Sequence, residues 1–146
     1  MAEESSVKQA ALWACRLILG GIFAYAATAK LIDPTNFARD IEHYDLVPYP
    51  VAIIGSVFLP WLELLCGLAV MLRRCERGAL VLLIGLCGLF ACALASAWWR
   101  GLDINCGCFG HATASSSFVT AIARDLGLGA VAFFLLWNVV DPQKSP

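Results

Sequence analysis

Four long apolar runs leave this chain few ways to fold. They cover residues 10–31, 50–72, 78–99 and 118–140, and each is long enough to cross a bilayer, which takes roughly 20 helical residues. Only 14% of the residues are charged and 60% are hydrophobic, whereas a soluble domain carries about 25% charged residues. A water-soluble chain of 146 residues could not bury that much apolar surface. The sequence therefore predicts an integral membrane protein.

The bilayer also restricts the fold class. Because lipid offers no hydrogen bonds to the backbone, open sheets and irregular segments cannot face it. Runs of this length predict helices, so we expect an all-α, integral membrane four-helix bundle that forms a single domain over residues 1–146. The net charge of −1 provides no basic surface for nucleic acid. The lipid bilayer, rather than nucleic acid, is the expected surrounding partner.

The first run has a second interpretation. Lys8 and Arg16 come before an apolar stretch that ends in Ala27-Thr28-Ala29, which resembles a signal peptide with its cleavage site. Arg16 lies inside the apolar stretch rather than before it, and this favours a membrane span.

Basic residues predict the orientation of the spans. Arg73, Arg74 and Arg77 lie in the short connection between the second and third runs, and such residues concentrate on the cytoplasmic side. Four spans then place both termini in the cytoplasm. The connections at 32–49 and 100–117 are expected on the outer side.

The first outer connection carries signals for a short helix between spans 1 and 2. Asp33 is a typical N-cap residue and Pro34 suits the first helical position. Phe37, Ile41 and Tyr44 recur at helical spacing, which predicts an amphipathic helix lying in the membrane interface. A plain surface loop is the alternative.

Pairs of small residues four apart predict where helices approach closely. Gly20 and Ala24 form such a pair in the first run. Further pairs in the third run are Gly88 with Cys92 and Ala91 with Ala95.

Charged residues inside the runs predict a polar interior. Arg16, Glu63, Arg124 and Asp125 would each cost about 2.5–3.5 kcal/mol at the membrane centre, so they should pair or lie shallow. At 1.5 Å per residue, Arg16 and Glu63 lie roughly 9 and 13 Å from the cytoplasmic face, which predicts an Arg16–Glu63 pair. Arg124 and Asp125 would lie beneath the second outer connection. These charges form either structural ion pairs or a polar pocket that conducts protons.

The seven cysteines fall into two groups. Five lie in or beside the runs, where cysteine usually packs as a small apolar residue: Cys15, Cys66, Cys75, Cys87 and Cys92. Cys106 and Cys108 instead lie close together in the segment NCGCFGH, with His111 behind them. Three ligands are too few for a closed zinc site, and a disulfide in so small a ring should be strained and labile. A redox pair, a structural staple and a tight turn all remain open.

Several segments together resemble a known family. The stretches KLIDPTNFARDIEHYDLVP, PWLELLCGL, NCGCFG and ARDLGL are similar to those of the methylamine-utilisation MauE family, within the DoxX-like membrane proteins. The resemblance covers nearly the whole chain in the same order. The matching positions are Lys30, Asp33, Pro34, Phe37, Glu63, Cys106, Cys108, Arg124 and Asp125.

The resemblance implies thiol–disulfide chemistry at the outer face of a bacterial cytoplasmic (inner) membrane. It implies Cys106 and Cys108 as the exchanging cysteines, a thioredoxin-like extracytoplasmic protein as partner, and maturation of a disulfide-rich enzyme such as methylamine dehydrogenase. Arg16, Glu63, Arg124, Asp125 and His111 would line the polar pocket. By analogy with other disulfide-forming membrane enzymes, a quinone would accept the electrons. The alternative is a non-catalytic assembly factor or a protein that binds a soft metal ion.

Overall fold

The computed structural model describes residues 2–101 and 118–140, and within them the chain forms five α-helices and no strand. They are α1 (Ala2–Ile32), α2 (Pro34–His43), α3 (Tyr49–Met71), α4 (Glu76–Trp99) and α5 (Phe118–Val140). Four of them, α1 from Ser6, α3, α4 and α5 from Val119, are long and apolar enough to cross a membrane. The predicted all-α membrane fold is confirmed.

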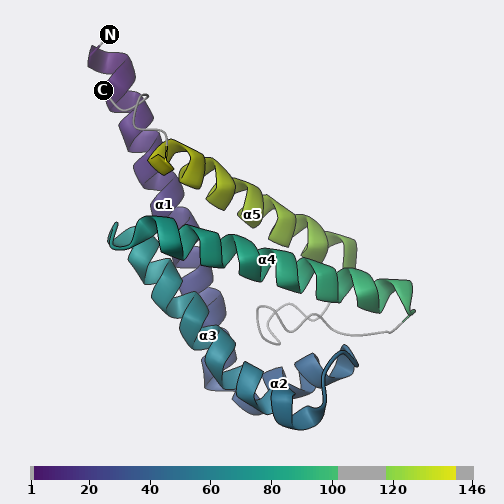
Figure 1. Cartoon of the computed structure of the whole chain (residues 1–146). Helices are drawn as coiled ribbons and strands as arrows, with labels where there is room; N and C mark the ends of the chain where they lie inside the picture. The colour runs from purple at the N-terminus through teal and green to yellow at the C-terminus, as the bar shows by residue number, and fades with distance from the viewer. Residues whose placement is uncertain (1, 102–117, 141–146) are drawn as a thin grey trace.

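Helix α1 is longer than its apolar run. It begins at Ala2, and its first turns project beyond the other helices (Figure 1). The residues before the run include Ala, Glu, Lys and Gln, which are good helix formers, and none is a proline or glycine. The helix therefore continues outside the apolar segment, where its side chains at 6–11 are exposed.

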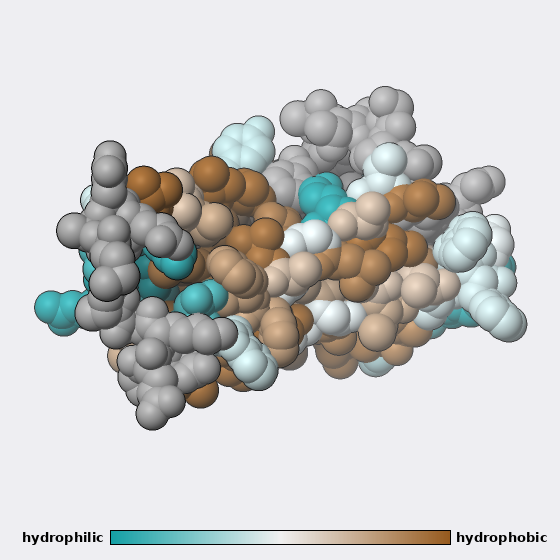
Figure 2. Space-filling view, turned by 90° about the horizontal axis from the view of Figure 1, so that it is seen from above, coloured by the Kyte–Doolittle hydropathy of each residue, from teal (hydrophilic) through white to brown (hydrophobic). Residues whose placement is uncertain are grey.

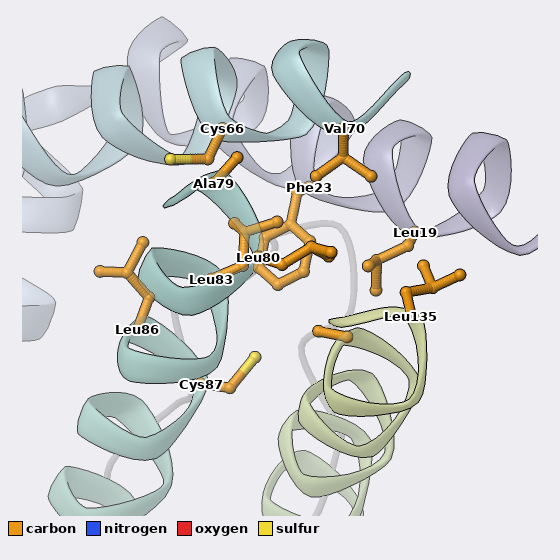
Figure 3. Close-up of a cluster of buried hydrophobic side chains, with 11 residues drawn as sticks. Leu19, Phe23, Cys66, Val70, Ala79, Leu80, Leu83, Leu86, Cys87 and Leu135 are labelled. Atoms are coloured by element: carbon orange, nitrogen blue, oxygen red, sulfur yellow. The ribbon is translucent and has the colours of Figure 1, made fainter. Parts of the chain in front are cut away.

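The spans form two pairs of neighbouring helices. Helices α1 and α3 lie side by side, as do α4 and α5, and the two pairs cross (Figure 1). Between them lies an apolar core to which all four spans contribute side chains (Figure 3). Apolar side chains also cover much of the outside of the bundle between its ends (Figure 2). Such a surface suits lipid rather than water.

The short helix α2 follows its predicted signals. The carboxylate of Asp33 accepts a hydrogen bond from the Asn36 backbone N–H at 3.1 Å, and Pro34 is the first helical residue. Phe37 and Ala38 are buried, and the helix packs against α3. The amphipathic helix between spans 1 and 2 is thus confirmed.

The closest approach of α1 and α3 involves two glycines. A Cβ atom added to Gly20 would lie 2.6 Å from the carbonyl oxygen of Gly67, and one added to Gly67 would lie 3.4 Å from the backbone nitrogen of Ala24. The packing role predicted for Gly20 and Ala24 is confirmed. The prediction for Gly88 and Cys92 is wrong.

A Cβ atom on Gly88 would meet nothing within 4 Å, and Cys92 is exposed. The packing prediction for Ala91 and Ala95 holds only for Ala91, which is buried, whereas Ala95 is exposed. A spacing of four identifies one face of a helix, but it does not say whether that face meets protein or lipid.

Candidate functional site

A buried ion pair joins α1 to α3. The ammonium of Lys30 donates to both carboxylate oxygens of Glu63 at 2.8 Å, and the two side chains are only 3% and 2% exposed. The same ammonium lies 5.1 Å from the ring centre of Phe37 and 4.7 Å from that of Phe90. Aromatic faces attract cations, so the rings of α2 and α4 complete the surroundings of this charge.

The predicted pairing of Glu63 with Arg16 is therefore wrong. Glu63 is buried and paired, but its partner is Lys30. The error is one of register: Gly20 faces Gly67, which displaces α1 by about five residues, or about 7.5 Å, from an alignment of the two run ends. In the sequence, Lys30 was identified only as a position that matches the family. A lysine at the end of an apolar run ordinarily extends towards water, so the run gave no sign that Lys30 is buried and paired.

Arg16 instead pairs with Glu76. Its Nε donates to the carboxylate at the first residue of α4, and the two side chains are 7% and 8% exposed. Glu76 lies outside the apolar runs, and only charged residues inside the runs were considered as partners for Arg16. At the same end, the guanidinium of Arg73 lies 5.7 Å from the ring centre of Trp13. These contacts fix the basic turn between α3 and α4 against the first half of α1.

A double-mutant cycle should identify the partner of Arg16. Arg16→Ala and Glu76→Ala should couple by about 0.5–3 kcal/mol in the free energy of unfolding, as contacting residues do. Arg16→Ala combined with Glu63→Ala should be additive within about 0.5 kcal/mol, as expected for residues without shared partners. Coupling of Arg16 to Glu63 but not to Glu76 would contradict the structure.

The second acidic site lies on α5. Asp125 is 7% exposed, and its Oδ1 accepts from Nε and Nη2 of Arg124, both at 3.3 Å. Successive residues of a helix do not face each other, so this is a long and lateral contact. The other oxygen, Oδ2, is buried and has no hydrogen-bond partner among the described residues.

A small cavity brings the two acidic sites together. It has a volume of about 20 Å³, and its polar lining groups are Lys30, Glu63, Cys87 and Asp125. These come one from each of the four spans. The remaining lining residues are apolar: Ile22, Phe23, Ala26, Phe90 and Leu128. The predicted association of Glu63 with Asp125 thus has a geometric basis, whereas Arg16 and Arg124 do not line this cavity.

The described cysteines occupy different environments. Cys66 and Cys87 are buried, Cys15 is partly buried, and Cys75 and Cys92 are exposed. In Figure 3 the side chain of Cys87 points into the space between α4 and α5. Cys106, Cys108 and His111 lie outside the described residues. Within residues 2–101 and 118–140, no three His, Cys, Asp or Glu side chains group together as a metal site would require.

The C-terminal end of α4 is tied to the end of α2. Arg100 follows the last residue of α4, and its guanidinium donates to the backbone carbonyls of Tyr44 and Asp45. The carboxylate of Asp45 also lies 3.9 Å from Nη1 of Arg100. The connection that contains the Cys-Gly-Cys segment therefore starts from an anchored position.

These features define a class: a multi-pass membrane protein whose four spans enclose buried charges around a small polar cavity. The chain belongs to the MauE family, since the family model described as "Methylamine utilisation protein MauE" matches residues 8–138. No solved structure matches the chain.

Three curated relatives carry the name "Methylamine utilization protein MauE". The protein of Methylorubrum extorquens is 32% identical over 127 residues, which cover 86% of this chain and 68% of the relative. That of Paracoccus denitrificans is 29% identical over 122 residues, covering 83% and 66%. That of Methylophilus methylotrophus is 29% identical over 121 residues, covering 82% and 64%. The chain thus spans about two thirds of the length of these relatives.

Proposed function

We propose that this protein takes part in thiol–disulfide exchange on the outer side of the membrane, with Cys106 and Cys108 as the exchanging pair. The observation that carries the proposal is the polar cavity within the bundle. Asp125 lies about 10 Å along α5 from Phe118, where the connection bearing both cysteines ends. Exchange requires thiols to lose and regain protons because the thiolate is the nucleophile. A buried carboxylate close to the start of α5 is suited to that task.

The proposed chemistry proceeds through a mixed disulfide. A thiolate of one partner attacks a disulfide of the other, forms a new sulfur–sulfur bond, and releases a thiolate that takes up a proton. The second cysteine of the pair then attacks the mixed disulfide and releases the partner. One protein gains a disulfide and the other gains two thiols, so the electrons balance between them. The proposed partner is a thioredoxin-like extracytoplasmic protein. The proposed pathway is methylamine utilisation, which the names of the relatives state for those proteins.

Trapping tests this proposal. Cys106→Ser or Cys108→Ser should accumulate a higher-mass species in cells that dithiothreitol releases, because the resolving thiol is missing. The double variant should accumulate none and serves as the matched control. If neither single variant traps a partner and the native pair resists strong reductant, the pair is a structural staple. The non-catalytic assembly factor is then the better description.

The proposal requires Cys106 and Cys108 to lie outside the cytoplasm. Two contacts support this orientation, since Arg16–Glu76 and Arg73–Trp13 hold the basic turn at the same end as the first half of α1. Basic residues favour the cytoplasmic side.

Labelling of intact cells checks the orientation. Single cysteines at Ser5, Thr35 and Ser145, in a chain without native cysteines, are treated with an impermeant maleimide. Only the Thr35 variant should react before permeabilisation, and all three should react afterwards. Labelling of Ser5 or Ser145 in intact cells would invert the orientation and contradict the proposed location of the pair.

A quinone does not fit the cavity. About 20 Å³ is room for one water molecule and far too small for a quinone ring. If a quinone accepts electrons from the pair, it must do so at another surface of the protein. Reoxidation of the reduced protein should then be faster with added quinone, and Asp125→Asn should leave quinone affinity unchanged.

A further inference from the structure

Of the two carboxylates that line the cavity, Glu63 has hydrogen-bond donors for both of its oxygens, whereas Asp125 has donors for only one within the part of the chain that the structure describes. Both oxygens of Glu63 accept from Lys30, so that pair is complete. Asp125 has one oxygen next to Arg124, while its buried Oδ2 has no partner among the described residues. A buried carboxylate oxygen normally accepts a hydrogen bond. Asp125 also lines the cavity, so a donor held there would lie next to this side chain.

We propose that the cavity binds one water molecule, which donates a hydrogen bond to Asp125 Oδ2. A volume of about 20 Å³ exceeds the roughly 10–15 Å³ that a single water requires. The wall also offers further polar neighbours, because the Glu63 carboxylate has spare lone pairs and Cys87 has a weak S–H donor. A bound water usually makes two to four hydrogen bonds, and this site supplies that number of groups.

Other occupants fit the site less well. An anion would face two carboxylates, Glu63 and Asp125, which already act on each other electrostatically. A metal cation would lie in the same small space as the Lys30 ammonium. An apolar group would leave Oδ2 without a donor. Water alone matches both the volume and the missing hydrogen bond.

The water has a structural consequence for the bundle. Lys30 and Glu63 belong to the α1–α3 pair, whereas Cys87 and Asp125 belong to the α4–α5 pair. The bound water therefore forms a further polar link between the two helix pairs, which elsewhere meet through apolar side chains and the Arg16–Glu76 ion pair. It also places an exchangeable proton between the two carboxylates.

The Cys87 thiol provides a probe of this site. Its S–H stretching vibration absorbs where few other protein groups do, and it shifts when the proton is replaced by deuterium. The full-length chain with Cys87 as its only cysteine is transferred to D₂O in lipid. The matched chain retains only Cys66, which is also buried in the core but does not line the cavity. Both chains lack Cys106 and Cys108, so the result is independent of the proposed thiol exchange.

We expect the Cys87 S–H to exchange at least about tenfold faster than that of Cys66, whose exchange must await local opening. Ala26→Val fills the cavity from α1 without removing a polar group, and it should abolish the difference. Asp125→Asn should keep the fast exchange, since an amide oxygen also accepts from water. Exchange of Cys87 no faster than that of Cys66 overturns the proposal, and this comparison decides even if Ala26→Val does not fold.

Discussion

Glu63→Gln should destabilise the folded protein by about 3–5 kcal/mol, because it leaves the buried ammonium of Lys30 without its counter-charge. Glutamine keeps the shape of the side chain, so the loss reports the charge rather than a new cavity. Lys30 is only 3% exposed and lies near two aromatic rings, so bulk water does not reach it, and the single water that the cavity can hold carries no charge to replace that of the carboxylate. The free energy of unfolding in bicelles, from titration with a denaturing detergent, measures the effect.

The double variant Lys30→Met/Glu63→Leu is the matched control. Replacing a buried ion pair by apolar residues of similar volume is often neutral or stabilising by about 1–4 kcal/mol. The double variant should therefore be more stable than Glu63→Gln alone. If the two variants were equally unstable, the cost would come from lost packing, and the Lys30–Glu63 pair would not be the cause.

The spans could be predicted because the bilayer fixes the length of each apolar run. The predicted runs 10–31, 50–72, 78–99 and 118–140 agree closely with the apolar helices that the structure contains. The short helix α2 could also be predicted, because the residues that signal it, Asp33, Pro34 and Phe37, lie within a few positions of one another. Local signals of this kind do not depend on how helices are arranged.

The partners of the buried charges could not be predicted in the same way. A depth counted from the end of a run assumes that neighbouring helices end at the same level, whereas α1 extends well beyond its apolar segment. Glu76 lay outside the runs and was not considered, although it is the partner of Arg16. Glu63 and Asp125 were thus predictable as buried acidic residues, but their partners and the other residues of the cavity depend on the register between helices.

That register is set where Gly20 meets Gly67, and Gly20→Ala should destabilise the protein by about 1–3 kcal/mol through overpacking. The new Cβ would lie 2.4 Å from Met71 Cγ and 2.6 Å from the Gly67 carbonyl oxygen. The methionine side chain can move, but the backbone oxygen moves only if α1 and α3 separate. Separation would also stretch the Lys30–Glu63 pair, which joins the same two helices.

The neighbouring glycine provides the control for this last prediction. Gly21→Ala introduces the same methyl group on the same helix, but nothing lies within 4 Å of the new Cβ. Both substitutions gain the same helix propensity, up to about 1 kcal/mol, so Gly21→Ala should be neutral or stabilising. The difference between the two unfolding free energies therefore measures the clash alone. Equal stabilities for the two variants would mean that α1 and α3 do not approach at Gly20, and the register that pairs Lys30 with Glu63 would have to be abandoned.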